Sequence, residues 1–136
     1  MSLSRYLVDT HTLLWYSQQV SPLPASLLVA LRELGATTYI SRVSLLEITI
    51  KYSLGKLQLP DPLRSWLRKT TEVGFRMLEI TDEHLVYMAS LPLLPNHRDP
   101  FDRLLIAQAL SEGLTLVSRD GKFAAYAGVG LRTQWA

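Results

Sequence analysis

The clearest sign of the fold is the run Leu114-Thr115-Leu116-Val117-Ser118-Arg119-Asp120, a short apolar stretch that follows Gly113 and ends in a carboxylate. A short run of mainly apolar residues is typical of a strand buried on both faces of a parallel sheet. Tyr6-Leu7-Val8-Asp9 repeats the pattern near the N-terminus. Between the two, apolar runs alternate with segments of helical periodicity, which indicates an α/β fold with a parallel sheet.

This alternation predicts the order of strands and helices along the chain. Strands are expected at Tyr6–Asp9, Thr37–Ser41, Phe75–Ile80 and Leu114–Ser118, with a weak fifth near Gly130–Thr133. Helices are expected at Thr12–Gln18, from Ser21 to Gly35, and at Val43–Leu54, Pro62–Val73, Asp82–Ser90, Phe101–Glu112 and Lys122–Tyr126. Prolines suited to a first helical turn and glycines that follow a last turn set several of these bounds.

Composition limits the classes of protein that this chain can represent. With 136 residues, 48% of them hydrophobic, the chain suits one globular domain over residues 1–136 with a substantial core. The absence of cysteine excludes disulfides, zinc–thiolate sites and cysteine nucleophiles. We expect no signal peptide, no membrane span and a cytoplasmic location. A net charge of +2 permits a polyanionic partner without pointing to one.

Four acidic residues lie in apolar surroundings, where an unpaired carboxylate is costly. They are Asp9, Glu47, Asp102 and Asp120. Asp9 and Asp120 end predicted strands, whereas Glu47 and Asp102 lie early in predicted helices, so all four are expected towards the carboxyl edge of the sheet. Carboxylates that meet there would repel one another, and a divalent cation would relieve the repulsion. The pattern predicts metal-dependent phosphodiester chemistry.

Each acid also has a local explanation. Asp9 and Asp120 suit turns or helix caps at strand ends. Ser44-Leu45-Leu46-Glu47 matches a capping box, and Lys51 is spaced to pair with Glu47. Asp99 before Pro100 is a natural helix cap, which leaves Asp102 without a structural role.

Other polar and aromatic residues have weaker assignments. Thr10 and Ser118 have hydroxyls that can hold a metal-bound water or orient a carboxylate. His11 and His97 are candidates to face the site, whereas His84 is expected on a helix surface. Four basic residues near the acids are candidates to contact phosphates flanking the scissile one: Arg98, Arg103, Arg119 and Lys122. The three tryptophans, Trp15, Trp66 and Trp135, are assigned to the core or to interfaces.

Taken together, four stretches resemble the successive motifs of PIN-domain proteins, and in particular the VapC-type toxins of bacterial toxin–antitoxin pairs. They are Leu7-Val8-Asp9-Thr10-His11; Ser44-Leu45-Leu46-Glu47-Ile48; His97-Arg98-Asp99-Pro100-Phe101-Asp102-Arg103-Leu104-Leu105-Ile106-Ala107-Gln108-Ala109; and Gly113-Leu114-Thr115-Leu116-Val117-Ser118-Arg119-Asp120. The resemblance implies a three-layer α/β/α domain with a central parallel sheet of four or five strands. It also implies Mg²⁺- or Mn²⁺-dependent endoribonuclease activity, homodimers and inhibition by a small antitoxin protein.

By motif position, Asp9, Glu47, Asp102 and Asp120 resemble the acidic residues of that family, and Asp99 resembles an additional acid. Asp9 and Asp120 are the first candidates for direct metal ligands, followed by Asp102. Glu47 is a candidate to bind through water or to orient the nucleophile. One metal ion would activate water, and a second would stabilise the leaving oxygen.

Two other functions stay open at this point. A Mg²⁺-binding phosphoacceptor or phosphatase-like domain also places acids at strand ends, but it needs a second acid after the first strand and a lysine near the last. Here Thr10 and His11 follow Asp9, and Lys122 is expected to be poorly placed. A non-catalytic RNA- or protein-binding module would use the acids as caps and structural pairs. An exposed groove between the amphipathic helices, lined by Trp15 or Trp66, is a candidate to hold an antitoxin segment.

Overall fold

Five parallel strands form the centre of the fold in the computed structural model, which describes residues 5–16, 25, 37–72 and 74–134. The strands are β1 (Arg5–Val8), β2 (Thr37–Ser41), β3 (Arg76–Leu78), β4 (Thr115–Val117) and β5 (Thr133–Gln134). They pair in the order β3-β2-β1-β4-β5, and every pairing is parallel. This arrangement confirms the predicted α/β fold with a parallel sheet.

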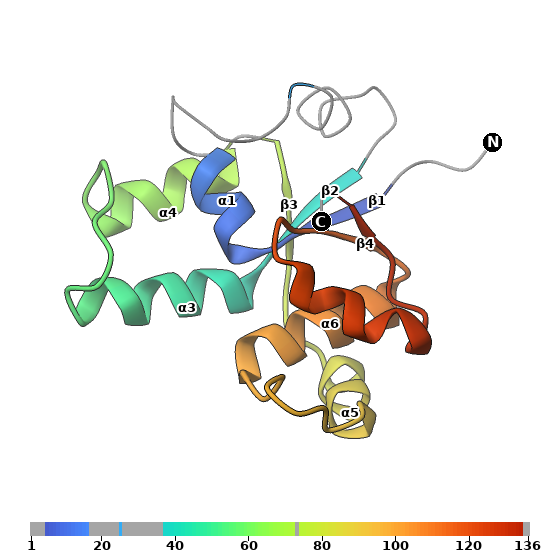
Figure 1. Ribbon diagram of the computed structural model, residues 1–136. Helices are drawn as coiled ribbons and strands as arrows, with labels where there is room; N and C mark the ends of the chain where they lie inside the picture. The colour runs from blue at the N-terminus through green and yellow to red at the C-terminus, as the bar shows by residue number, and fades with distance from the viewer. Residues whose placement is uncertain (1–4, 17–24, 26–36, 73, 135–136) are drawn as a thin grey trace.

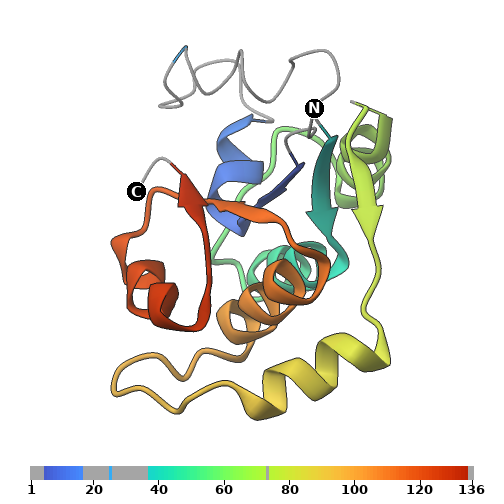
Figure 2. The same ribbon diagram turned by 90° about the vertical axis from the view of Figure 1, so that its right-hand side faces the viewer.

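Helices cover both faces of the sheet (Figure 1). The described helices are α1 (Thr10–Tyr16), α3 (Arg42–Ser53), α4 (Leu63–Glu72), α5 (Asp82–Ser90), α6 (Pro100–Glu112) and the 3₁₀ helix η1 (Gly121–Val129). In both Figure 1 and Figure 2, α6 lies between the sheet and α5. The result is the three-layer α/β/α arrangement that the resemblance implied.

Alternating side chains of β1 divide the core into two parts. Leu7 packs into a cluster formed mainly by α6, β4 and η1, whereas Tyr6 and Val8 pack into a second cluster with residues of α1, α3 and α4. Successive side chains of a strand point to opposite faces of the sheet, so a buried central strand needs apolar residues throughout. The apolar run Tyr6-Leu7-Val8 therefore fixes the sheet between two helical layers and leaves Asp9 at its end.

Several element bounds differ from the predicted ones. Helix α1 begins at Thr10 rather than Thr12, because the Asp9 carboxylate accepts a hydrogen bond from the Thr12 backbone N–H and caps the helix. The η1 helix runs to Val129 rather than Tyr126, and Gly130 ends it with a left-handed φ of 97°. The helix predicted from Ser21 to Gly35 falls almost wholly outside the described residues.

A buried polar network holds α5 and α6 to the sheet. Gln108 Oε1 accepts a hydrogen bond from Ser41 Oγ at 2.5 Å, and Gln108 Nε2 lies 3.3 Å from His84 Nδ1. His84 Nδ1 also accepts from the Thr81 backbone N–H, while His84 Nε2 faces Glu112 Oε1 at 3.2 Å. The expectation of a surface His84 is therefore wrong: its side chain is fully buried because its ring completes this network.

Arg103 is also buried, with its guanidinium bound to the end of α5. It donates hydrogen bonds to the backbone carbonyl oxygens of Met88, Leu91 and Pro92. The prediction that Arg103 contacts phosphates is therefore wrong, because its donors face backbone carbonyls. Among the described residues, no helix is both long enough and apolar enough to cross a membrane.

Candidate active site

The four candidate acids all lie at the carboxyl edge of the sheet. Asp9 directly follows β1, and Asp120 follows β4, the parallel neighbour of β1. Glu47 lies in α3, which begins immediately after β2, and Asp102 lies in the first turn of α6. The parallel pairing of β1 with both β2 and β4 thus brings the first three segments to one edge. Helix α6 adds the fourth acid from the layer that packs on the sheet.

Asp9 is the most firmly held of the four acids. Its carboxylate is 4% exposed, and Ser118 Oγ donates a hydrogen bond to Oδ2 at 2.6 Å. The backbone N–H of Thr12 donates to Oδ1 at 2.8 Å. The local explanation as a helix cap is therefore confirmed, as is the predicted use of the Ser118 hydroxyl to orient a carboxylate. These contacts hold Asp9 at the end of the central strand in a single orientation.

Glu47 is also buried, and two side chains hold its carboxylate. Thr10 Oγ1 donates to Oε1 at 2.8 Å, and Lys51 Nζ lies 2.9 Å from Oε2. The pair with Lys51 is thus confirmed. The capping box is wrong, because α3 begins at Arg42 and its cap is Ser41, which accepts from the Val43 N–H. Glu47 therefore lies past the first turn of the helix, where backbone N–H groups already have partners within the helix.

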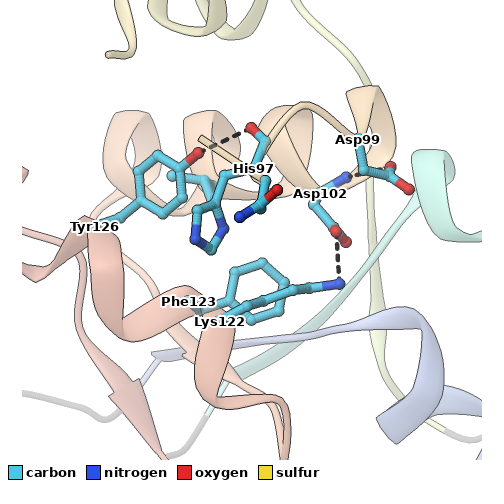
Figure 3. A pocket seen from close by; sticks show the side chains of 8 residues that line it. His97, Asp99, Asp102, Lys122, Phe123 and Tyr126 are labelled. Atoms are coloured by element: carbon cyan, nitrogen blue, oxygen red, sulfur yellow. Dashed lines mark hydrogen bonds and ion pairs between the residues drawn. The ribbon is translucent and has the colours of Figure 1, made fainter. Parts of the chain in front are cut away.

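Asp102 and Asp120 share one cation, the ammonium group of Lys122 (Figure 3 shows the contact with Asp102). Lys122 Nζ lies 2.6 Å from Asp102 Oδ2 and 3.2 Å from Asp120 Oδ2. Asp99 caps α6 by accepting from the N–H groups of Phe101 and Asp102, as predicted. The prediction that Lys122 lies near the acidic residues is confirmed by these two pairs. Asp120 caps η1, and Lys122 lies in the first turn of that helix, where its side chain can reach the acids.

Burial and neighbouring charges shift the pKa values of Asp102, Asp120 and Lys122. Burial raises the pKa of Asp102, and the negative charges of Asp99 and Glu47 raise it further, although Lys122 opposes them. Burial would also raise the pKa of Asp120, but hydrogen bonds from Lys122 lower it, and electrostatic interactions with Lys122 and the nearby His11 lower it further, so that the net shift is downward. The two carboxylates outweigh burial at Lys122 and raise the pKa of its ammonium group. The lysine is thus held in its charged form between the two acids.

The residues present suit a hard divalent cation by their chemistry. Carboxylate oxygens are the ligands that Mg²⁺ and Mn²⁺ prefer. Asp102 and Asp120 already converge on one positive charge, that of Lys122. Within the described part of the chain, no three Asp, Glu or His side chains are grouped closely enough to hold a metal ion as they stand. Binding a cation at this edge would therefore require Lys122 to release its two carboxylates.

Two cavities adjoin the acids. One, of about 270 Å³, is lined by Asp9, His11, Trp15, Arg119 and Asp120. The other, of about 160 Å³, is lined by Asn96, His97, Asp99, Asp102, Ile106, Lys122, Phe123 and Tyr126. Figure 3 shows the second cavity, with the rings of His97, Phe123 and Tyr126 grouped beside the Asp102–Lys122 pair. His11 and His97 thus face the site, each from a different cavity.

The structure also places residues that the sequence assigned differently or did not single out. Trp66 is 2% exposed, which confirms its assignment to the core. The prediction that Trp66 lines an exposed groove is therefore wrong. Trp135 lies outside the described residues. Phe123 and Tyr126 were not singled out as site residues, and their spacing along a predicted short helix was the available signal that they share a face.

Comparisons with known proteins show the family and the fold. The PIN-domain family model matches residues 6–129. The chain is 29% identical over 115 residues to ribonuclease VapC22 of Mycobacterium tuberculosis, covering 84% of this chain and 85% of that protein.

Solved structures share the fold at lower sequence identity. The structure of VapBC2 from Rickettsia felis, bound to a DNA fragment from its promoter, matches with a TM-score of 0.68 and 20% identity, covering 96% of this chain and 97% of that one. DNA-bound VapBC from Salmonella typhimurium matches with a TM-score of 0.67 and 16% identity, covering 98% and 100%. Given the match over nearly its whole length, the chain belongs to the PIN-domain family.

Proposed function

We propose that this protein is a metal-dependent endoribonuclease that hydrolyses RNA phosphodiester bonds and acts as the toxin of a toxin–antitoxin pair. The observation that carries the proposal is the placement of four acids at one edge of a PIN fold, two of them paired with the same lysine. A relative of similar length is named as a ribonuclease, which supports the same activity.

Asp9, Asp102 and Asp120 are the proposed ligands of Mg²⁺ or Mn²⁺, with Glu47 beside them. The bound metal would supply positive charge to the phosphate as negative charge develops in the transition state. Ser118 and Thr12 keep both oxygens of Asp9 in place, so this carboxylate needs no reorganisation before it acts. Thr10 holds Glu47 in the same way, which suits it to orient an attacking water molecule.

Lys122 has a further part in this proposal. Its ammonium group neutralises Asp102 and Asp120 in the structure and must leave them before they can act as ligands. The flexible stem of a lysine permits this movement without a change in the backbone. After release, the ammonium group lies close enough to the acids to face a bound phosphate.

The proposed partners are RNA, a small antitoxin protein and a second copy of this chain. Neighbours in fold are VapBC assemblies, as their descriptions state for R. felis and S. typhimurium. Helices α3 and α5 carry exposed apolar side chains suited to protein contacts, among them Leu46, Ile50 and Tyr52 on α3 and Leu85, Val86 and Tyr87 on α5. A cytoplasmic location fits these partners and stays part of the proposal.

The phosphoacceptor alternative has less support from the site. Asp9 is buried, and both of its oxygens already accept hydrogen bonds from the protein. Each of these oxygens keeps a second lone pair, so the hydrogen bonds of Asp9 do not distinguish a phosphoacceptor from a metal ligand, and the distinction rests on the neighbouring residues. The described ion pairs of Lys122 are with Asp102 and Asp120, and the second acid that such a domain needs after β1 is missing, since Thr10 and His11 follow Asp9.

Replacement of Asp9 by Asn tests the proposed function. Asp9→Asn keeps an acceptor for Thr12 and removes the negative charge, so we expect a folded protein that cleaves RNA at least 100-fold more slowly. The measurement is cleavage of total RNA in Mg²⁺ or Mn²⁺, with a chelator control and a thermal melt. Asp61→Asn is the matched control, because Asp61 pairs with Lys69 and lines neither of the cavities beside the acids. Full activity of Asp9→Asn would overturn the site.

A further inference from the structure

The cavity of about 270 Å³ beside Asp9 and Asp120 has a wall that the proposed chemistry does not use. Three side chains form it: His11 and Trp15 from α1, and Arg119 from the loop after β4. The two acids at its other side belong to the candidate active site. A group bound against this wall would therefore lie directly beside the reacting phosphate.

The three side chains of this wall are held as one unit. His11 and Trp15 are one helical turn apart, and their ring centroids lie 5.8 Å apart with the planes tilted by 35°. The guanidinium carbon of Arg119 lies 5.9 Å from the centre of the Trp15 ring, within the range of a cation–π contact. Trp15 is half-buried, whereas His11 and Arg119 are exposed. The indole thus acts as an anchor for two planar groups that face solvent.

The charge of this wall suits an anionic strand. In the part of the chain that the structure describes, Arg119 forms no ion pair with an acid, unlike Lys51, Lys69 and Lys122. Arg119 therefore brings to this wall a positive charge that no acid among the described residues pairs with.

The cavity shown in Figure 3 offers a useful contrast. Its cation, Lys122, is already paired with two acids. Its rings are packed against each other, since His97 and Tyr126 meet edge to face and the Tyr126 hydroxyl donates to the His97 carbonyl oxygen. The wall of His11, Trp15 and Arg119 is thus the better candidate for a ligand.

We propose that His11, Trp15 and Arg119 form a subsite that stacks against a nucleobase of single-stranded RNA, next to the scissile phosphate. This inference rests on the proposed ribonuclease function and names how that site positions its substrate. Unpaired bases stack on aromatic rings and on arginine planes, and such stacking tolerates any base because every base has a π face. The subsite selects unpaired RNA over duplex RNA, whose bases are stacked on one another.

RNA binding measured in the presence of a chelator tests this subsite separately from metal-dependent cleavage. The probes are two fluorescein-labelled strands of equal length: a single-stranded RNA, and the same strand with abasic positions in its centre. We expect wild-type protein to prefer the strand with bases by about 5- to 150-fold, the range for loss of one stacked base. Trp15→Ala should lose this preference, and Trp15→Phe should retain most of it because it keeps an aromatic ring.

Arg119 variants separate stacking from simple charge. Arg119→Lys keeps the positive charge but loses the planar group, so we expect it to lose part of the preference for the strand with bases. Arg119→Ala also loses the charge, so we expect it to bind the abasic strand less tightly as well. Arg68→Ala is the matched control, since Arg68 is an exposed arginine on α4 and does not line the cavity. Fluorescence anisotropy gives the dissociation constants, and circular dichroism shows that each variant is folded.

The outcomes separate failure of the subsite from failure of the proposed function. If wild-type protein cleaves RNA but Trp15→Ala keeps the full preference for bases, the subsite is overturned and the nuclease stands. The same conclusion follows if free nucleoside monophosphates bind as tightly as the strand, because the site would then serve a mononucleotide. If wild-type protein neither binds nor cleaves RNA while Trp15→Ala weakens binding of a protein partner, the ribonuclease function and the subsite both fail.

Discussion

Lys122 is the residue that most affects how the candidate site can bind a metal ion. Its ammonium group lies 2.6 Å from Asp102 and 3.2 Å from Asp120, so it occupies the position towards which two proposed ligands converge. Buried or half-buried acids that share a cation are stable as a group and costly when that cation is removed. The lysine and a divalent cation are therefore alternatives at the same pair of carboxylates.

Replacement of Lys122 by Met tests this competition. Lys122→Met keeps the apolar stem and removes the charge, so without metal we expect a loss of about 1 kcal/mol in the free energy of unfolding, a modest value because the lysine is partly exposed. Mn²⁺ should bind more tightly to the variant. Urea unfolding in chelator and calorimetric titration with Mn²⁺ measure the two effects.

The control for Lys122→Met is Lys69→Met, which breaks the exposed pair with Asp61. We expect no change in its affinity for Mn²⁺. Weaker binding of Mn²⁺ by Lys122→Met than by wild-type protein would mean that the lysine helps the cation rather than competing with it.

Thr10 is the second residue with a specific expected effect, because its hydroxyl donates to buried Glu47 at 2.8 Å. Thr10→Val has the same shape without the donor. We expect a loss of about 1–3 kcal/mol in the free energy of unfolding, since a carboxylate oxygen is left without one of its donors. The turnover number for RNA cleavage should fall, while RNA binding in chelator stays unchanged. Thr10→Ser should restore turnover, and its failure to do so would contradict the role of the hydroxyl.

At the residue scale, local rules predicted positions well and partners poorly. Asp9 and Asp120 were placed correctly because an acid that ends an apolar run must lie at a strand end. Asp99 was placed correctly because a following proline suits a first helical turn. The partners of Lys122 were not predicted, because its reach depends on the path of η1, which only the packed fold determines.

At the scale of helices and strands, the order along the chain was predictable, and the exposure of α5 was not. Its sequence Asp82-Glu83-His84-Leu85-Val86-Tyr87 contains three apolar residues, and these are 49%, 62% and 40% exposed, whereas His84 is fully buried. Hydrophobic periodicity finds a buried face only where the contact is apolar. Helix α5 instead contacts α6 partly through the polar network of His84, Gln108 and Glu112. Hydrophobic periodicity therefore predicts the wrong buried face for α5.

Gln108→Leu tests how much this polar network contributes. The substitution removes the acceptor of Ser41 and the partner of His84 Nδ1 in a fully buried place. We expect a loss of about 1–3 kcal/mol in the free energy of unfolding, since buried polar groups lose their partners. Urea unfolding measures the change, and hydrogen exchange should show earlier opening of α5. Gln58→Leu, at an exposed position between α3 and α4, is the matched control. Equal stability of the two variants would mean that the network contributes nothing.

At the scale of the whole molecule, the fold brings together acids that the chain separates widely. Asp9 and Asp120 are more than one hundred residues apart, and adjacent parallel strands place them at one edge. The sequence could predict this meeting because carboxyl ends of parallel strands share an edge. It predicted the pair of Lys51 with Glu47, which lie one turn apart on α3. It could not predict that Lys122 pairs with Asp102 and Asp120, because those contacts depend on how η1 packs against α6.

This separation along the chain makes metal binding a property of the folded protein alone. A cation that binds only the native state stabilises it by about 2.7 kcal/mol at a concentration one hundred times its dissociation constant. For a domain of this size, that gain corresponds to a rise of roughly 5–15 °C in Tm. We expect Mn²⁺ and Mg²⁺ to raise the Tm of wild-type protein and of Asp61→Asn, and excess chelator to reverse the rise. Asp102→Asn should show a much smaller rise, because it loses a proposed ligand. Metal dependence would be contradicted if the protein cleaves RNA in chelator and neither metal changes the Tm of wild-type protein. The four acids would then have a role that needs no cation.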